Sequence, residues 1–235
     1  MSGAPRPGGA RQAERRARGD MAGASGQSEL FAQPQALPSG LLYCPDFIAL
    51  DEEGELLAHI DSLPFKEARF QQYTARRRVV RFGEGDYLEA EPDQPTDHPR
   101  IEFPEFLKGV RAKVAAWLDM SPGEFVHALC TEYAPGTPIG WHRDAPHFEI
   151  VAGLSLANAC RMRFRPLDEA RRDEVFVLEL QPRSLYVMRG DIRWFWQHNI
   201  PPVKATRYSI TLRTLRVGPP PRLPRVSRAA RLTST

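Results

Sequence analysis

His142 and Asp144 are separated by a single residue in the stretch EYAPGTPIGWHRDAPHFEI, residues 132–150. Side chains alternate along an extended strand, so these two would project from the same face. Two histidines and one carboxylate on one face of an octahedron can hold a mononuclear iron and leave its other positions open. His147 and Glu149 form a second His-x-acid pair in the same stretch. The spacing alone therefore leaves both pairs open as metal ligands.

A third ligand has to come from elsewhere in the chain. Besides His142, the histidines are His59, His98, His127, His147 and His198. His198 lies in RWFWQHNIPP, on a segment that reads as a strand and is well separated from His142 in sequence. We therefore take His198 as the candidate for the third ligand.

The segment RYSITLR has alternating polar and apolar residues, as a strand with two unlike faces would. Its polar face would carry Arg207, Ser209, Thr211 and Arg213. A strand whose polar face lies in water has the same pattern. If this face lines a pocket instead, its two arginines could bind a dicarboxylate. The planar guanidinium binds a carboxylate through two hydrogen bonds and keeps its charge when partly buried.

Two helices followed by a series of short strands would position these residues. Apolar residues at helical spacing predict helices over 51–63 and 103–120. Short alternating or apolar segments predict strands at 125–131, 139–143, 150–157, 161–165, 174–180, 184–189, 194–200 and 207–215. Evenly spaced short strands of this kind indicate a sandwich, barrel or jelly roll. The predicted fold class is therefore α+β, with the functional residues in the β part.

Composition divides the chain into one domain and two tails. Residues 1–38 are rich in Gly, Ala, Ser, Pro and Arg and offer little to bury, so we expect them to be disordered. Residues 217–235 form a second, basic and proline-rich tail. The remaining 39–216 have the length of a single domain. Within it, 65–100 is arginine-rich and then acidic and proline-rich.

Hydropathy, cysteine content and net charge argue against several classes of protein. No apolar run approaches the roughly 18 residues that a membrane helix needs. Three cysteines without a C-x-x-C pair argue against a disulfide framework or a structural zinc cluster and for a reducing compartment. A net charge of +3 is compatible with a polyanionic partner. With no apolar secretory signal at the N-terminus, we expect a cytoplasmic protein, and no feature indicates a protein partner.

The ordered combination of EYAPG, H-x-D, H-x-I-P and R-x-S-x-T-x-R resembles AlkB-like Fe(II)- and 2-oxoglutarate-dependent dioxygenases, the nucleic-acid dealkylation family. The resemblance covers about residues 40–216. It implies a double-stranded β-helix (jelly roll) core with N-terminal helices and a substrate-covering lid over about 65–100. Fe(II), 2-oxoglutarate and O2 are the cofactors it implies.

The same resemblance assigns the site residues. Its H-x-D…H triad falls on His142, Asp144 and His198, which favours this set over His147 and Glu149. Its co-substrate contacts fall on Tyr133, Arg207, Ser209 and Arg213, with Arg207 as the better candidate for the far carboxylate of 2-oxoglutarate.

The chain departs from the family pattern at three points. Thr131 stands where the family usually has Asn, and Ser209 stands where some members have Asn. Ala145 and Pro146 replace an acidic residue that touches the target base in some members.

The implied reaction is oxidative demethylation of alkylated nucleobases in DNA, with RNA as a second candidate, releasing formaldehyde, succinate and CO2. A target base flipped out of a duplex would need aromatic stacking and phosphate contacts. Candidate substrate residues are Tyr73, Arg77, Phe82, Tyr87 and Arg163. Alternatively, the aromatic residues could simply pack in the core, and the arginines could lie on a solvated surface.

Two other functions remain open from the sequence. The same oxygenase chemistry could act on a protein, a lipid or a small molecule. Alternatively, the chain could be a β-sandwich that binds nucleic acid without redox chemistry, although that function leaves the ordered triad and the paired arginines unexplained.

Overall fold

The computed structural model describes residues 36–70, 73–84 and 101–222, and for 68–70 and 73–76 the backbone alone. From Leu37 onward these residues belong to one compact unit. Strands dominate it, and all of their pairings are antiparallel. No helix of the described part is long and apolar enough to cross a membrane.

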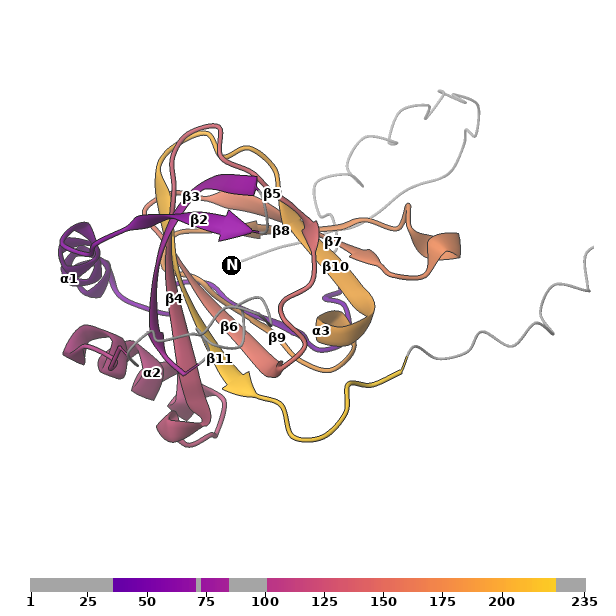
Figure 1. The fold of residues 1–235 in the computed structure, drawn as a ribbon, viewed down its shortest axis with the longest axis horizontal. Coiled ribbons are helices and arrows are strands. Elements are labelled where there is room, and N and C mark those ends of the chain that lie inside the picture. The colour runs from indigo at the N-terminus through magenta and orange to yellow at the C-terminus, as the bar shows by residue number, and fades with distance from the viewer. Residues whose placement is uncertain (1–35, 71–72, 85–100, 223–235) are drawn as a thin grey trace, which may run out of the picture. The chain divides into compact units, whose positions relative to one another are not determined.

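Two sheets carry the fold (Figure 1). In spatial order the large sheet consists of β1 (Leu41–Cys44), β9 (Leu185–Met188), β6 (Phe148–Leu156), β11 (Arg207–Leu215), β4 (Phe125–Tyr133), β3 (Tyr73–Gly83) and β2 (Lys66–Phe70). The small sheet consists of β5 (Ile139–His142), β10 (Trp196–Ile200), β7 (Cys160–Pro166) and β8 (Phe176–Leu180). This is the expected double-stranded β-helix, so the predicted fold class is confirmed.

One hydrophobic core lies between the two sheets. Met162, Phe164 and Leu180 of the small sheet share it with Val151 and Met188 of the large sheet, and all five are almost fully buried. Each strand of the small sheet therefore directs alternate side chains toward the large sheet, which is the arrangement that a pocket between the sheets requires.

A second core lies on the other face of the large sheet, under helices α1 (Leu50–Asp61) and α2 (Glu105–Trp117). Both helices lie on the same side of the large sheet, at the left of Figure 1. Buried side chains of the helices, such as Ile60, Leu107 and Val114, pack with Ala128 and Ile210 of the sheet. The helices stiffen the wall that carries β4 and β11 and leave its other face to the site.

Outside the segment predicted as a lid, the predicted helices and strands match the observed ones within a few residues, with two differences. Residues 194–200 begin with the end of a short helix, α3 (Asp191–Phe195), before β10 starts at Trp196. The strand β1 was not expected, because four residues are too few to show a pattern. Two 3-10 turns, η2 (Pro122–Glu124) and η3 (Glu169–Arg171), complete the described elements.

The segment predicted as a lid is in part a hairpin of the large sheet. Strands β2 and β3 pair with each other, and β3 continues along β4 from Arg78 to Gly83. Val79, Val80 and Phe82 are residue types that favour a strand, but the arginines around them concealed this preference. Residues 85–100, the rest of the predicted lid, lie outside the described part of the chain.

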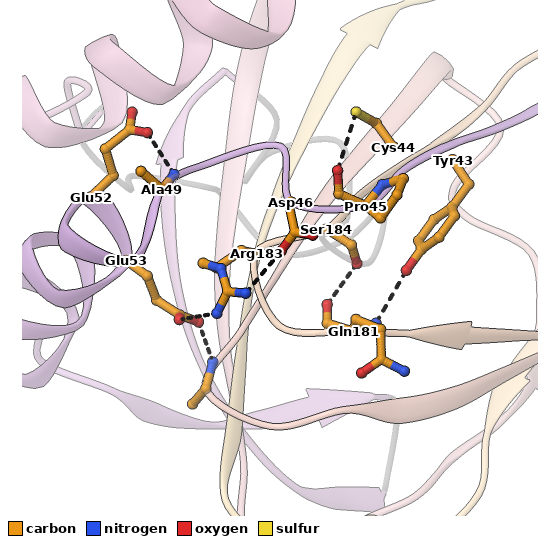
Figure 2. Close-up of polar contacts among 11 residues, drawn as sticks. Tyr43, Cys44, Pro45, Asp46, Ala49, Glu52, Glu53, Gln181, Arg183 and Ser184 are labelled. Carbon is orange, nitrogen blue, oxygen red and sulfur yellow. Dashed lines mark hydrogen bonds and ion pairs between the residues drawn. The ribbon is translucent and has the colours of Figure 1, made fainter.

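A polar cluster ties the start of α1 to the residue after β6 and to the turn before β9. Figure 2 shows Arg183 directed at both Asp46 and Glu53. The Arg183 guanidinium lies 2.8 Å from an oxygen of Asp46 and 3.6 Å from the buried Glu53 carboxylate. Glu53 also accepts a 2.8 Å hydrogen bond from the backbone N–H of Ala157. Asp46, Ala157 and Arg183 all have a positive φ, a conformation that persists only where neighbouring contacts hold it.

We expect the substitution Glu53→Ala to lower the free energy of unfolding by about 2 kcal/mol, because it leaves the Ala157 N–H and one side of Arg183 without a partner. Glu53→Gln keeps an acceptor and should cost less. Urea denaturation followed by circular dichroism measures both, with the exposed Glu55→Ala as the matched control. Equal stability of Glu53→Ala and Glu55→Ala would contradict this role.

Candidate active site

His142, Asp144 and His198 meet at one end of the small sheet. His142 is the last residue of β5 and is the register partner of His198 in β10. Asp144 follows two residues after the end of β5. One ligand atom from each of the three residues lies within 4.8 Å of the others. Among the described residues this is the group of histidine, cysteine and acidic side chains that could hold a metal ion.

The rival pair does not join this group. Glu149 accepts a hydrogen bond of 3.0 Å from the indole N–H of Trp194. The ring of His147 packs edge-on against Phe148, with centroids 4.2 Å apart. Both residues follow the turn after Asp144, where the chain enters β6, so their side chains belong to the packing around that turn.

The environment sets the charges of the three groups. Burial, and then the neighbouring His142, lower the pKa of His198 to about 3, although Asp144 opposes the shift. Burial alone would raise the pKa of Asp144, but Arg213 and then the two histidines outweigh it and hold this pKa well below its usual range. At neutral pH the carboxylate is ionised and His198 is neutral, which are the forms that bind a metal ion.

Arg213 orients the Asp144 carboxylate. Its Nη2 donates to Oδ1 of Asp144 at 2.9 Å, while Oδ2 lies 3.4 Å from Nε2 of His198. One carboxylate oxygen is thus held by the guanidinium and the other is directed at the second histidine. Such contacts behind a metal ligand fix its geometry and its affinity for the metal.

His127 holds the other side of the same guanidinium. It is the register partner of Arg213 on β4, and its Nδ1 lies 3.2 Å from Nη1 of Arg213. Burial, and then the charge of Arg213, lower the pKa of His127 to about 2. The neutral ring therefore presents Nδ1 as the acceptor, and a line of contacts runs from His127 through Arg213 to Asp144.

Arg207 lies deeper along the same face of β11. Its side chain is among the largest fully buried ones, and its guanidinium carbon lies 4.7 Å from the centre of the Tyr133 ring. Nη2 donates to the hydroxyl of Ser155 at 3.0 Å, while Nε and Nη1 have no hydrogen-bond partner among the described residues. A buried cation with two uncommitted donor nitrogens needs an anionic partner.

The wall around this arginine is formed by neighbouring residues of β4 and β11. Ser209 and Thr131 are register partners and are both buried, next to the pair formed by Arg207 and Tyr133. Each of the two carries a short hydroxyl side chain where the family pattern has the longer amide of Asn. Thr131 lines the small inner cavity of about 70 Å³, together with Tyr133 and the three candidate ligands.

A larger cavity of about 550 Å³ opens beside the candidate metal ligands. Its charged lining residues are Arg77, Arg81, Arg143, Asp144, Arg193 and Arg213. Asp144 is the acidic residue among them, and Arg213 already neutralises it. The mouth of the site is therefore strongly basic.

The predicted substrate residues fall in different places. Arg77 lines the mouth. Phe82 does not, because it packs in the helix-side core on the opposite face of β3. Arg163 does not either, since it lies on the outer face of the small sheet and bonds to Asn199. The side chain of Tyr73, and Tyr87 altogether, lie outside the described part of the chain. The assignment of Phe82 as a stacking residue is therefore corrected. Arg163 lies outside the cavity, and its role as a phosphate contact stays a prediction.

Sequence reasoning missed several residues of the wall, namely Leu129, Met162, Tyr186 and Trp194. Tyr186 lies in an apolar strand that reads as plain core. Its ring crosses Gly153 of β6 so closely that a Cβ at that position would collide with it. A glycine inside a strand is the signal that could have indicated such an approach.

The sequence also showed no sign of the role of Arg193, whose side chain is buried. Its Nη2 donates to the carbonyl oxygens of Ala145 at 2.7 Å and Phe148 at 2.8 Å. It thereby fastens the turn that follows Asp144 to α3, the helix that leads into His198. The two segments that carry the candidate ligands are thus tied together.

Comparison with known proteins identifies relatives over most of the chain. An uncharacterized protein of Acanthamoeba polyphaga mimivirus is 26% identical, covering 75% of this chain and 85% of that protein. An Arabidopsis thaliana protein named "Alkylated DNA repair protein ALKBH8 homolog" is 27% identical, covering 77% of this chain and 59% of its own length. Mus musculus "tRNA (carboxymethyluridine(34)-5-O)-methyltransferase ALKBH8" is 31% identical over 72% of this chain. The match spans only 25% of that mouse protein.

Solved structures share the fold. The structure described as that of OsALKBH1 has a TM-score of 0.59 at 14% identity, covering 77% of this chain and all of that one. A prolyl-4-hydroxylase from Pseudomonas putida has a TM-score of 0.54 at 17% identity, covering 75% of this chain and 93% of that one.

The model of the 2OG-Fe(II) oxygenase superfamily matches residues 40–218. The residues present fit its cofactors, because two imidazole side chains and an ionised carboxylate converge, and a buried arginine with two uncommitted donor nitrogens lies along the same wall. Fe(II), 2-oxoglutarate and O2 are thus the cofactor and co-substrates implied for this site. The chain belongs to the 2OG-Fe(II) oxygenase superfamily and, as its sequence motifs predicted, is AlkB-like.

Proposed function

We propose that this chain oxidatively demethylates alkylated nucleobases in DNA, with RNA as a second substrate. The observation that carries the proposal is the basic cavity mouth beside the candidate iron ligands. Arg77, Arg143 and Arg193 line it, and the carboxylate in its lining, Asp144, is bound to Arg213. A polyanion is the substrate that such a mouth attracts.

The names of the relatives support a nucleic-acid substrate. The Arabidopsis relative is named as an alkylated-DNA repair protein and the mouse relative as a tRNA methyltransferase. The mouse match spans a quarter of that protein, so the tRNA activity in its name is not transferred to this chain. It is the reason to test RNA beside DNA.

The site residues have distinct roles in the proposal. His142, Asp144 and His198 hold Fe(II), and Arg213 keeps Asp144 ionised and oriented. When bound, Fe(II) with 2-oxoglutarate and O2 supplies the oxidation of a C–H bond, coupled to the release of succinate and CO2. An N-linked methyl group oxidised in this way leaves as formaldehyde.

The co-substrate would lie along β11. Arg207 offers Nε and Nη1 to its far carboxylate, with Tyr133 and Ser209 completing the polar wall. Because this arginine is buried and stacked on Tyr133, its side chain is already held before the carboxylate arrives.

A single extruded base could occupy the mouth. The cavity of about 550 Å³ is within the range of small-molecule sites. An enzyme that acts on a base must take it out of the stack. The basic mouth could bind the flanking phosphates while the base enters the cavity.

A protein substrate is the second candidate, because the Pseudomonas putida prolyl-4-hydroxylase shares the fold. At 17% identity that likeness concerns the fold alone. A neutral proline-containing peptide gives the arginines of the mouth nothing to bind, so the electrostatics favour the nucleic acid.

We expect His198→Ala to abolish tight metal binding and His147→Ala to preserve it. The first removes one of three converging ligands, whereas the second removes a ring outside the group. Calorimetric titration with Mn²⁺ in the absence of oxygen measures the affinity directly. Loss of binding in His147→Ala with retention in His198→Ala would overturn the ligand assignment.

We expect Arg207→Lys to weaken 2-oxoglutarate binding by at least about 2 kcal/mol, roughly thirtyfold, because one point charge replaces a two-armed donor in a buried site. Mn²⁺ affinity should stay unchanged, since Arg207 does not contact the three ligands. Titration of 2-oxoglutarate into the Mn²⁺-loaded protein tests this. Unchanged 2-oxoglutarate affinity would show that another cation binds the far carboxylate.

Incubated with Fe(II), ascorbate and 2-oxoglutarate, the purified protein should release formaldehyde from methylated single-stranded DNA. Arg77→Gln should raise the KM for the oligonucleotide about tenfold, a loss near 1.5 kcal/mol, because it removes a charged hydrogen bond to phosphate. The exposed Arg171, which pairs with Glu174 far from the mouth, provides the control Arg171→Gln.

Parallel reactions with methylated RNA of the same sequence and with a proline-containing peptide separate the substrate classes. Turnover of the peptide alone, with intact 2-oxoglutarate binding, would contradict the nucleic-acid proposal and leave the oxygenase assignment in place.

A further inference from the structure

The outer face of the small sheet carries a group of side chains that the active site does not use. His142 and His198 point inward, so their neighbours Trp141 and Asn199 point outward. On β7, Met162 and Phe164 are buried in the core, which places Arg163 and Arg165 on the outer face as well. Trp141 and these two arginines define what we call the outer basic face.

The two guanidinium groups of this face are held in fixed positions. Their carbons lie 5.3 Å (Arg163) and 4.2 Å (Arg165) from the centre of the Trp141 ring. Arg163 donates its Nε to Asn199 at 2.8 Å, and Arg165 donates Nε and Nη2 to Gln197 at 3.0 and 2.9 Å. None of their nitrogens is buried without a partner, so the remaining N–H groups face solvent.

This fixed geometry matters for binding. A long arginine side chain normally loses conformational entropy when it binds a phosphate. Stacking on Trp141 and the bonds to the two amides have already ordered these side chains. Their outward N–H groups are thus prepared for an anion with several oxygens.

No carboxylate of the described residues neutralises Arg163 or Arg165. Elsewhere on the surface, arginines do pair with acids: Arg78 with Glu132, Arg171 with Glu174 and Arg183 with Asp46. Arg161, the third arginine of β7, has Glu179 as its register partner and is therefore left out of the outer basic face. The register partner of Arg163 is Val177, which adds no charge.

The outer basic face adjoins the mouth of the active site through the strand that bears His142. Trp141 and Arg143 flank this ligand in sequence, and Arg143 lines the mouth. Two residues of extended chain span about 7 Å, so a ligand leaving the mouth reaches Trp141 and its arginines within a short distance.

We propose that the outer basic face binds the phosphodiester backbone of the nucleic-acid strand beside the nucleotide that enters the active site. The proposal rests on the proposed function, since the strand is the continuation of that substrate. Contacts of this kind position a strand and contribute affinity without reading its sequence. The chain would then require a substrate longer than the target nucleotide and its nearest neighbours.

The test compares the double variant Arg163→Gln/Arg165→Gln with the matched control Arg171→Gln/Arg172→Gln. Both remove two positive charges, but the control residues lie at η3 and pair with Glu174 and Glu169. Fluorescence anisotropy with Mn²⁺, 2-oxoglutarate and no oxygen measures binding of methylated oligonucleotides of about twelve and about three nucleotides. DNA and RNA of the same sequence form separate arms, and each Kd is measured over a range of salt concentrations.

For the long oligonucleotide, the double variant should bind more weakly than the wild type. The slope of log K against log salt should fall by about 1.4, or about 0.7 for each phosphate of a single strand that the variant no longer neutralises. Its affinity for the short oligonucleotide and the slope of the control should stay at wild-type values. A second variant, Arg163→Lys/Arg165→Lys, keeps the charges and should retain the slope, which provides a readout even if the glutamine pair disturbs the sheet.

Equal slopes for the double variant and the control, with normal turnover of the methylated oligonucleotide by the wild type, would overturn the outer basic face and leave the proposed function standing. If the wild type neither binds nor oxidises any oligonucleotide, the proposed function fails, and this inference with it. Stronger binding of a polyglutamate peptide than of either nucleic acid, abolished in the double variant, would assign the face to an acidic protein instead.

Discussion

The buried pair of Arg213 and Asp144 is the interaction on which the site depends. A carboxylate removed from water would ordinarily take up a proton, and the adjacent guanidinium is the main group that keeps this one ionised. The same 2.9 Å contact turns the second oxygen toward His198. His127 fixes the guanidinium from behind, so a metal ligand at the end of the small sheet is oriented by two strands of the large sheet.

This arrangement explains why the large sheet needs the helices. Strand β11 carries Arg213 and Arg207 on one face, while Ile210 and Leu212 on the other face pack against the core under α1 and α2. Two buried arginines cost desolvation energy that the apolar face must offset. One face of β11 thus contributes to the hydrophobic core, and the other carries the arginines of the active site.

The sequence predicted the parts of the site that rest on short local patterns, because alternation along RYSITLR and the H-x-D pair each determine a face. It could not predict which face of β3 and β7 meets the pocket. Phe82 was assigned to the target base on residue type, but it lies on the face of β3 that packs under the helices. Arg163 lies on the outer face of β7, away from the cavity. The contacts of Arg193 and the passage of Tyr186 over Gly153 join segments far apart in sequence, so no local pattern could show them.

The central claim is that the His142, Asp144 and His198 side chains hold the metal while Arg207 anchors the far carboxylate of 2-oxoglutarate. A crystal structure of the protein with Mn²⁺ and 2-oxoglutarate tests both parts at once. We predict the metal about 2 Å from one atom of each of the three side chains. We also predict the far carboxylate within hydrogen-bond distance of Nε and Nη1 of Arg207. A metal bound by His147 and Glu149, or a far carboxylate that leaves Arg207 without a partner, would contradict the claim.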